Sequence, residues 1–220
     1  MSKPIIYFLF IALFSVHAFG NDKQFIVLIG PPCSGKTTYA KEFEKQGYVH
    51  IYPSGVLRTM LKAGDPLALE YEKQIITCCP GIPSNIIENI VQKILRETLN
   101  KNPLQKIVFD GFPRSVKQAE FLSKELRAIN PRFDLQAILL KLPKKILIAR
   151  AMGRLECEEC HYVLTAKLKK CPKCSGTIKA RAMDKERLFM ERLDRFNNWS
   201  FPVVEYYQTK NQLKIISKVR

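Results

Sequence analysis

The sequence contains no repeat, linker or long apolar run that would indicate more than one folded domain. It has no internal repeat and no low-complexity linker, so neither a repeat array nor a string of loosely tethered domains is indicated. Its longest apolar run, Ile5 to Phe14, has ten residues and is too short to span a membrane comfortably. With 220 residues, 46% of them hydrophobic and 25% charged, the chain can bury one sizeable core and carry a small insertion.

Acidic residues are scarce relative to basic ones, 20 against 36, which gives a formal net charge of +16. This charge suits a polyanionic ligand such as a nucleotide, and it would also favour nucleic acid or an anionic membrane surface. Stretches such as Lys141 to Lys145 are typical of a solvated surface, and we assign most of the excess charge to such a surface. We therefore expect a monomer with no nucleic-acid partner and no stable membrane span.

The first twenty residues have the pattern of a secretory signal peptide. Lys3 precedes the apolar run, and Ala18 and Gly20 are small residues at cleavage positions. We predict a signal peptide over residues 1–20 and one domain over 21–220, with an additional buried strand or helix as the alternative for the first segment. Export would place seven cysteines in an oxidising compartment with little ATP, whereas the nucleotide chemistry argued below favours a cytoplasm-like one. The sequence leaves that conflict open.

A phosphate-binding loop is the strongest motif. The residues from Gly30 to Thr37, GPPCSGKT, match G-x-x-x-x-G-K-[ST] and lie between an apolar strand and a helical pattern. In that context, backbone N–H groups and the helix N-terminus point at a phosphate. Lys36 would reach the β- and γ-phosphates of a nucleotide, and the Thr37 hydroxyl would bind Mg²⁺. The loop candidates for ATP binding are Gly30, Cys33, Ser34, Gly35, Lys36, Thr37 and Thr38.

A second motif, DGFPR from Asp110 to Arg114, directly follows another apolar strand. An aspartate at a strand end beside a phosphate-binding loop can hold Mg²⁺ through water. The planar Arg114 guanidinium can bind a phosphate through two parallel hydrogen bonds. The motif therefore extends the predicted phosphate site.

Strand and helix patterns alternate along the chain, which predicts a doubly wound α/β fold with a parallel five-stranded sheet. The expected strands are 25–29, 48–51, 106–109, 135–140 and 213–216. The expected helices are 38–45, 55–99 with breaks at 64–66 and 80–83, 115–128, 144–152 and 184–198. Pro202 interrupts or restarts the last helical pattern.

Two C-x-x-C pairs form the third motif. Cys157 with Cys160 and Cys171 with Cys174 offer four thiolates for a tetrahedral Zn²⁺ site, and a small hairpin would bridge the ten residues between the pairs. Disulfides are the alternative if the chain is exported. His161 adjoins the first pair, but four cysteines already complete the ligand set.

Further short motifs accompany these three: Ser54-Gly55-Val56-Leu57-Arg58, Gln118, Gly153-Arg154, Arg181-Ala182-Met183-Asp184 and Arg192-Leu193. Together they resemble the adenylate kinase family over residues 24–220. The resemblance implies Mg²⁺-dependent transfer of the ATP γ-phosphoryl group to AMP, giving two ADP. It also implies a P-loop kinase core with a helical monophosphate-binding insert near 53–83 and a small zinc-binding lid over about 154–182.

The resemblance also implies a role for each matching residue. Arg150 and Arg154 would contact ATP near the lid hinge, beside the loop and Lys36. The residues implied to bind AMP are Ser54, Arg58, Gly111, Phe112, Pro113, Arg114, Gln118, Arg181 and Arg192. Among these, Arg58 and Arg114 would grip the phosphate, and Ser54 and Gln118 would seat the base. The implied catalytic residues are Lys36, Arg114, Arg154, Arg181 and Arg192, and Thr37 and Asp110 would serve Mg²⁺.

Three positions depart from the family pattern. Cys33 replaces a usual glycine, whose small size allows close phosphate approach; we expect weakened ATP binding. Its thiol, beside Lys36 and a helix N-terminus, is a candidate for a lowered pKa, although a tolerated small residue is the simpler interpretation. The Ser54 segment is one residue shorter than usual, with Val56 where an acid is usual, and Met183 replaces the first of two acids.

Three alternatives stay open at this point. The same chemistry could act on UMP, CMP or another monophosphate. A non-catalytic nucleotide- or nucleic-acid-binding protein could use the loop and the cysteine knuckle, although Tyr162 is the only aromatic residue in the hairpin. An inactive kinase homologue is the third, suggested by Cys33 and the shortened Ser54 segment.

Overall fold

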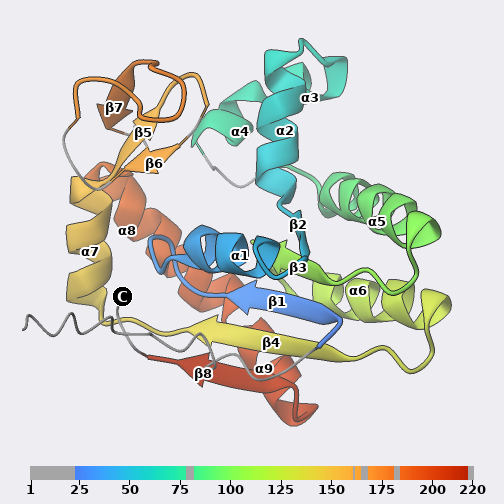
Figure 1. The fold of residues 1–220 in the computed structure, drawn as a ribbon. Helices are drawn as coiled ribbons and strands as arrows, with labels where there is room; N and C mark the ends of the chain where they lie inside the picture. Colours follow the sequence, from blue (N-terminus) through green and yellow to red (C-terminus); the bar gives the residue numbers. More distant parts are fainter. Residues whose placement is uncertain (1–22, 78–81, 161, 165–167, 181–183, 218–220) are drawn as a thin grey trace, which may run out of the picture.

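The computed structural model describes residues 23–77, 82–160, 162–164, 168–180 and 184–217. Its centre is a five-stranded sheet in the order β2-β3-β1-β4-β8, with every neighbouring pair parallel (Figure 1). The strands are β1 Phe25–Ile29, β2 Val49–Ile51, β3 Ile107–Asp110, β4 Leu135–Leu140 and β8 Leu213–Ile216. The predicted parallel five-stranded α/β fold is confirmed, and β1, β4 and β8 have the predicted bounds.

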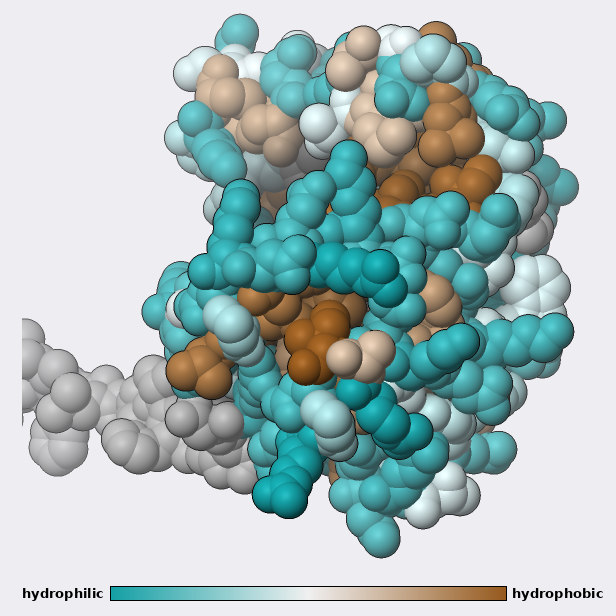
Figure 2. Space-filling view, turned by 90° about the vertical axis from the view of Figure 1, so that its right-hand side faces the viewer, coloured by the Kyte–Doolittle hydropathy of each residue, from teal (hydrophilic) through white to brown (hydrophobic). Residues whose placement is uncertain are grey.

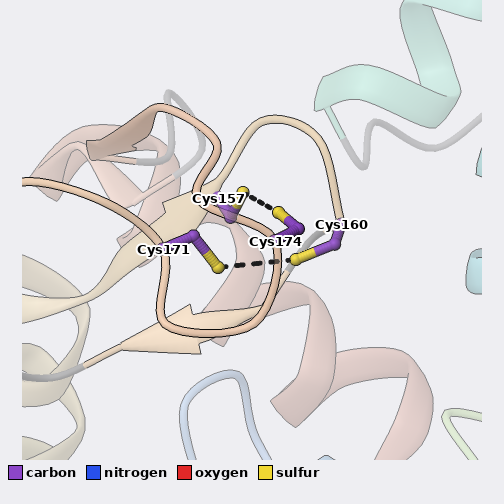
Figure 3. A group of neighbouring side chains, drawn as sticks. All are labelled: Cys157, Cys160, Cys171 and Cys174. Atoms are coloured by element: carbon purple, nitrogen blue, oxygen red, sulfur yellow. Dashed lines mark hydrogen bonds between the residues drawn. The ribbon is translucent and has the colours of Figure 1, made fainter.

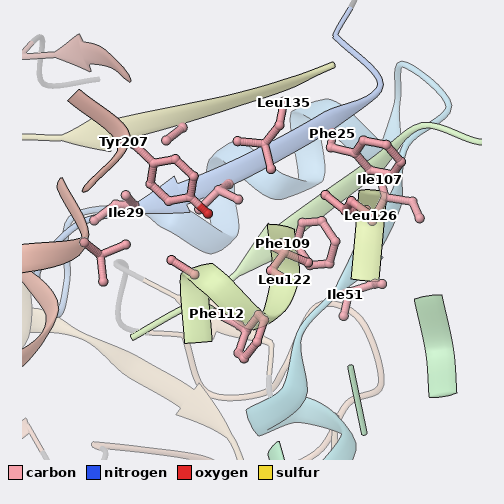
Figure 4. Close-up of a cluster of buried hydrophobic side chains, with 14 of the residues drawn as sticks. Phe25, Ile29, Ile51, Ile107, Phe109, Phe112, Leu122, Leu126, Leu135 and Tyr207 are labelled. Atoms are coloured by element: carbon pink, nitrogen blue, oxygen red, sulfur yellow. The ribbon is translucent and has the colours of Figure 1, made fainter. Parts of the chain in front are cut away.

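Alternating residues of the strands pack on opposite faces of the sheet, because successive side chains of a strand point to opposite sides. Phe25, Val27 and Ile29 of β1 join the larger core, whose aromatic and aliphatic side chains interlock in Figure 4. Ile26 and Leu28 join the core on the other face. The larger core is covered by α5 (Ser84–Lys101), α6 (Val116–Ile129) and α9 (Pro202–Thr209), and the smaller by α1 (Lys36–Glu44).

The neighbouring strands β1 and β3 bring two of the predicted motifs together. Leu28 is in register with Asp110, and both strands run in the same direction. The phosphate-binding loop after β1 and the DGFPR segment after β3 therefore leave the sheet at the same edge. In open parallel sheets this edge is where ligands bind.

Three short helices project from this edge: α2 (Pro53–Lys62), α3 (Pro66–Glu70) and α4 (Glu72–Thr77). They have a small core of their own, formed by Leu57, Ala68 and Ile75. The predicted break at 64–66 is present, and the Asp65 carboxylate caps α3 by accepting from two backbone N–H groups. The helical region begins at Pro53, two residues before the expected start, and is interrupted again at Tyr71. Residues 80–81 of the second predicted break lie outside the described residues.

A small antiparallel sheet in the order β6-β5-β7 stands between α7 (Lys144–Gly153) and α8 (Glu186–Arg195). Its strands are β5 Leu155–Cys157, β6 Val163–Leu164 and β7 Ile178–Ala180. Leu147 and Ala151 of α7 pack on Phe189 and Leu193 of α8, which fixes the base of this small sheet on the main body. Figure 1 shows the small sheet and the α2–α4 helices side by side above the same edge of the main sheet.

The predicted helix over 184–198 is wrong at its C-terminal end. α8 ends at Arg195, and Phe196–Ser200 forms a π-helical turn, η3, in which the Phe201 N–H donates to the Phe196 carbonyl at 2.9 Å. Pro202 has no N–H to continue the helical hydrogen bonds, and the wider turn inserts one residue before α9. Pro202 predicts from the sequence that the helix is interrupted here. That the interruption takes the form of a π turn depends on packing.

Within the part of the chain that the structure describes, no helix is long and apolar enough to cross a membrane. The face shown in Figure 2 is mostly hydrophilic, with hydrophobic side chains confined to smaller patches and hollows. The predicted signal peptide over 1–20 lies outside the described residues.

Candidate active site

A cavity of about 410 Å³ opens at the edge of the main sheet, between the phosphate-binding loop, the α2–α4 helices and the end of α8. Eight of the predicted site residues line it: Gly30, Lys36, Ser54, Gly111, Pro113, Arg114, Gln118 and Arg192. The volume is sufficient for a nucleotide-sized ligand. Residues from four separate segments of the sequence thus meet around one hollow.

Lys36 supplies a cation to this cavity that has no anionic partner in the part of the chain that the structure describes. Its Nζ donates to the backbone carbonyls of Gly30 (2.7 Å) and Pro31 (3.0 Å). Among the described residues, no carboxylate lies within ion-pair distance of it. Burial lowers the pKa of Lys36 to about 8, and the nearby Asp110 only partly offsets that effect. A bound phosphate would provide the missing negative charge.

Asp110 is almost fully buried, with 2% of its surface exposed, at the end of β3. Thr37 Oγ1 donates to its Oδ2 at 2.7 Å, and His50 Nε2 lies 3.5 Å from the same oxygen. Burial alone would raise the pKa of the Asp110 carboxyl, but the close approach of His50, the charge of Lys36 and the hydrogen bond from Thr37 together lower it. Asp110 is therefore an ionised carboxylate beside a hydroxyl, which is a hard oxygen pair suited to Mg²⁺.

Cys33 adopts the left-handed conformation, with φ of 64°. This explains why glycine suits the position, because a residue with a Cβ is strained there. The Cys33 side chain packs against the α7–α8 cluster, which compensates part of the strain. Burial raises the pKa of the Cys33 thiol, outweighing the nearby Arg154 and Lys36. The lowered pKa considered from the sequence is therefore wrong, because burial dominates over the neighbouring cations.

We expect the Cys33 thiol to be unreactive. At pH 8, iodoacetamide should alkylate the Cys33 peptide about tenfold or more slowly than an unstructured thiol peptide, because only the thiolate attacks and burial disfavours it. Mass spectrometry of the digested protein measures this rate at Cys33 alone, and the same protein unfolded in urea is the control. Equal rates for the folded protein and the reference peptide would contradict the buried, protonated thiol.

Arg114, Ser54 and Gln118 form one hydrogen-bonded group on the cavity wall. The Arg114 guanidinium donates to the Gly111 carbonyl (2.8 Å) and to Ser54 Oγ (3.1 Å). Gln118 accepts from the Arg114 backbone N–H at 2.8 Å and donates to Ser84 Oγ at 2.9 Å. Ser54 thus lies against Arg114 rather than apart from it. Its contact fixes the direction of a guanidinium that can bind a phosphate.

Two residues of the predicted monophosphate set lie differently from the rest. The Phe112 side chain is 1% exposed and packs in the larger core, so only its backbone can face a ligand. Arg58 donates to Tyr52 Oη at 2.9 Å, and its guanidinium lies 5.2 Å from the centre of the Tyr52 ring. Tyr52 in turn stacks on His50, with ring centres 5.8 Å apart and planes at 11°. This aromatic pair connects Arg58 to the buried Asp110.

Asp184 holds two of the predicted arginines in place. Both oxygens of its carboxylate accept from Arg154, at 2.6 Å each, and Oδ1 also accepts from Arg192 at 3.0 Å. Asp184 is 5% exposed, and both guanidinium groups are mostly buried. Burial alone would lower the pKa of Arg154, but the hydrogen bonds to Asp184 outweigh it and raise that pKa. Two cations are thus fixed beside the phosphate-binding loop.

The remaining predicted residues are placed as follows. A Cβ added at Gly35 would come within 3.7 Å of Arg150 Nη1, so this guanidinium faces the phosphate-binding loop. Ser34 Oγ is buried and has no hydrogen-bond partner among the described residues. Thr38 lies in the first turn of α1 and does not line the cavity. Arg181 lies outside the described residues, as does His161.

Four cysteines meet in the small sheet. The first pair lies at the turn from β5 to β6, and the second lies in the loop that leads to β7, rather than at the two ends of one hairpin. The sulfur atoms turn toward one another in Figure 3, and all four lie within 4.8 Å of one another. The Sγ atoms of Cys157 and Cys174 are 3.5 Å apart, and those of Cys160 and Cys171 are 3.6 Å apart.

This cluster fits a tetrahedral metal ion. Zn–S bonds of about 2.3 Å imply S···S distances of about 3.8 Å in a regular tetrahedron, close to those observed. A disulfide requires about 2.05 Å, so neither pair is bonded. Burial alone would raise the pKa of Cys171, but backbone N–H groups, including that of Lys173 at 3.4 Å, lower it to about 7. Such N–H groups stabilise the thiolate that a metal requires.

The small sheet touches both the α2–α4 helices and α1. Lys62 at the end of α2 donates to the carbonyl of Glu159 at 2.7 Å, within the turn that carries the first cysteine pair. On the other side, Lys41 of α1 lies 5.2 Å from the centre of the Tyr162 ring. The small sheet is therefore in contact with the elements on two sides of it, the end of α2 and α1.

Sequence reasoning missed three functional candidates. His50 and Tyr52 were not singled out, since a histidine in a strand and a tyrosine after it carry no motif. Asp184 was noted as a remaining family acid but was not given a role. Its position two residues before α8 was the available signal, because Arg192 lies two helical turns further on.

Comparison with known proteins gives a consistent result. A family model described as adenylate kinase matches residues 28–212. The adenylate kinase of Thermodesulfovibrio yellowstonii is 35% identical over 200 residues, which cover 87% of this chain and 90% of the relative. The adenylate kinase of a Geobacillus species is also 35% identical over 200 residues, with the same coverage of both chains. That of Clostridium perfringens is 31% identical over 198 residues, covering 87% of this chain and 89% of the relative.

Proposed function

This chain belongs to the adenylate kinase family, and from that premise we propose that it catalyses the reversible, Mg²⁺-dependent transfer of the ATP γ-phosphoryl group to AMP. The observation that carries the proposal is the set of cations around one cavity. Lys36, Arg114 and Arg192 line it. Among the described residues no carboxylate pairs with Lys36, and Arg192 shares the carboxylate of Asp184 with Arg154.

In the proposed reaction the ATP phosphates lie on the loop from Gly30 to Thr37. Lys36 binds the β- and γ-phosphates, and the Arg150 guanidinium, close to Gly35, binds ATP from the α7 side. Bound Mg²⁺, held by Thr37 and by Asp110 through water, would neutralise charge between the phosphates. The ionised state of Asp110 and its 2.7 Å contact with Thr37 support that assignment.

The acceptor AMP occupies the other half of the cavity. Arg114 is directed by the Gly111 carbonyl and Ser54, and it binds the AMP phosphate together with Arg58. Leu57, Ile82 and Ile87 provide an apolar wall for the base, and Gln118 provides a polar group at its edge. This arrangement brings the acceptor phosphate toward the γ-phosphoryl group with no covalent intermediate.

During transfer, negative charge spreads over the equatorial oxygens of the phosphoryl group. Arg154 and Arg192, held together by Asp184, and Arg181 are proposed to stabilise that charge. The small sheet over 154–182 acts as a lid that keeps water away, so that AMP rather than water receives the phosphoryl group. The α2–α4 helices within 53–83 act as the monophosphate-binding insert, and the enzyme works as a monomer.

A coupled assay of ADP formation tests the function. The purified protein is given Mg·ATP and, in turn, AMP, UMP, CMP and GMP, with a Lys36→Met variant as the blank. ADP formation strongest with AMP and absent from the blank is the expected result. Fastest turnover with UMP or CMP would reassign the acceptor, and no turnover from folded, metal-loaded protein would overturn the kinase.

The metal in the lid is proposed to be zinc, which the Cys₄ ligand set favours over harder ions. Purified protein should contain about one zinc per chain by elemental mass spectrometry. A Cys160→Ser variant should lose it, and proteolysis should then cut within 154–180, because so small a sheet has little core of its own. Cys33→Ser, a cysteine outside the cluster, is the matched control and should keep the metal. A metal-free protein with an equally protected lid would contradict the assignment.

A further inference from the structure

The sole tryptophan of the chain, Trp199, lies at the cavity rather than in a core. It is 57% exposed and lines the cavity together with Phe196 and Ser200 of the same π turn. Large aromatic side chains usually bury most of their surface, so an exposed tryptophan facing a ligand cavity has surface available for a ligand. No described hydrogen bond or ring contact occupies it.

The π turn η3 carries the Trp199 side chain and places it at the cavity. A regular continuation of α8 through residue 200 would keep the helical spacing of its side chains. The inserted residue of η3, closed by the hydrogen bond from the Phe201 N–H to the Phe196 carbonyl, shifts that spacing before α9 begins at Pro202. π turns are frequent at functional sites, and this one interrupts the helix that carries Arg192 and Arg195, two further cavity residues.

Further apolar side chains of the cavity come from a different part of the chain. Leu57 lies in α2, Ile75 in α4, Ile82 in the segment before α5 and Ile87 in the first turn of α5. A planar base in the monophosphate half of the cavity therefore meets aliphatic side chains from the insert and an indole from the π turn. Tryptophan is the side chain with the greatest stacking surface for such a base.

We propose that Trp199 is a specificity-determining residue, which stacks on the base of the acceptor monophosphate and favours a purine over a pyrimidine. This inference rests on the proposed function, because it assigns Trp199 to the acceptor site of that reaction. A purine offers the indole two fused rings for stacking, whereas a pyrimidine offers one. Stacking on Trp199 therefore stabilises bound AMP more than bound CMP or UMP. It adds a selectivity element that does not depend on hydrogen bonds to the base edge.

Binding is measured first, independently of turnover. Because the chain has one tryptophan, its intrinsic fluorescence reports Trp199 alone. Titration of the full chain with AMP in the absence of ATP should give saturable quenching, and CMP should require about tenfold higher concentrations for the same effect. Inorganic phosphate, which has no base, should leave the emission unchanged. No response to AMP, with AMP binding seen by calorimetry, would overturn the proposal.

Variants then separate stacking from structure. Trp199→Ala should raise the KM for AMP about tenfold with the KM for ATP unchanged, and should lower the preference for AMP over CMP to a similar degree. Trp199→Phe should stay within about threefold of the wild type, because a phenyl ring still stacks. Phe201→Ala is the matched control, an exposed aromatic residue beside the same turn that does not line the cavity, and should change neither KM.

The outcomes distinguish this proposal from the function on which it rests. If the wild type turns over AMP but Trp199→Ala leaves KM and base preference unchanged, Trp199 has no such role and the kinase stands. If the wild type turns over no monophosphate, the function fails, and the fluorescence titration still decides whether the indole meets a purine nucleotide. Equal increases in the KM for ATP and AMP would show a general structural effect and would also overturn the proposal.

Discussion

Replacing Lys36 by methionine abolishes phosphotransfer, with kcat falling about 10³-fold or more, to the background of the coupled assay. The reason is the unpaired state of the Lys36 ammonium, which donates to two backbone carbonyls and has no carboxylate partner among the described residues. Methionine keeps the length and apolar stem of the side chain but removes the charge. The developing charge on the β- and γ-phosphates then loses its nearest cation.

The same variant should fold as stably as the wild type or more stably. In the folded protein the pKa of Lys36 is about 8, below its usual 10.5, so burial of the charged form opposes folding below about pH 8. That penalty fades as the pH rises from 8 toward 10.5, and methionine removes it at every pH. Thermal unfolding at pH 7 and pH 9 measures the effect, and we expect the advantage of the variant to be larger at pH 7.

Lys45→Met makes the same chemical change at the exposed end of α1, where Glu42 is the ion-pair partner of Lys45 among the described residues. This control should keep full activity, because exposed ion pairs contribute little. Residual activity of Lys36→Met above one tenth of the wild type would show that the P-loop lysine is not the main cation of the site. A variant that fails to fold would instead contradict the energetic cost assigned to the buried ammonium.

Replacing Asp184 by asparagine should lower both stability and activity. The change leaves the Arg154 and Arg192 guanidinium groups side by side in a mostly buried place without their shared carboxylate. Removing one partner of a buried ion pair costs about 3–5 kcal/mol, which corresponds to a fall in Tm of roughly 6–12 °C for a chain of this size. We also expect kcat to fall about 100-fold or more, because the two arginines lose the contact that aims them.

Saturating ATP should narrow the difference in Tm between Asp184→Asn and the wild type. The nucleotide phosphates bring negative charge to the Arg154 and Arg192 guanidinium groups. This charge replaces part of the negative charge that the Asp184 carboxylate supplied, so bound ATP stabilises the variant more than the wild type. Glu191→Gln is the matched control, an acid of α8 with half of its side chain exposed and only a 3.9 Å contact to Arg187. It should behave like the wild type. Unchanged kcat and Tm in Asp184→Asn would show that Asp184 does not position the arginines.

Local patterns were sufficient where the signal was strong and short in range. The runs FIVLI, LQAILL and LKII became β1, β4 and β8 with no shift, because buried parallel strands are continuous apolar segments. The GPPCSGKT loop predicted Lys36 next to a helix N-terminus, and the two C-x-x-C pairs predicted the sulfur cluster. Each of these features is encoded in fewer than about twenty consecutive residues, or in a spacing that chemistry restricts.

Predictions were weaker wherever the outcome depended on packing between distant segments. Nothing in the sequence placed Arg114 against Ser54, sixty residues earlier, or Lys62 on the turn at Glu159. The helix predicted from residue 184 ended early, because the Phe201 N–H donates to the Phe196 carbonyl and closes a π turn. The spacing of apolar residues does not predict such a turn. The raised pKa of Cys33 was not visible in the sequence for the same reason, since the burial that causes it comes from packing against α7 and α8.

The sequence by itself determined the fold class, the phosphate-binding loop, the cysteine ligand set and the membership of the adenylate kinase family. These follow from apolar periodicity and from residue spacings that can be recognised without knowledge of the tertiary structure. Only the tertiary structure decided which groups meet. It placed the Lys36 ammonium on two backbone carbonyls with no carboxylate partner among the described residues, and it gave two arginines the shared carboxylate of Asp184. It also placed the indole of Trp199 at the cavity. Electrostatics and burial depend on distances in space, and folding brings together residues that the chain keeps far apart.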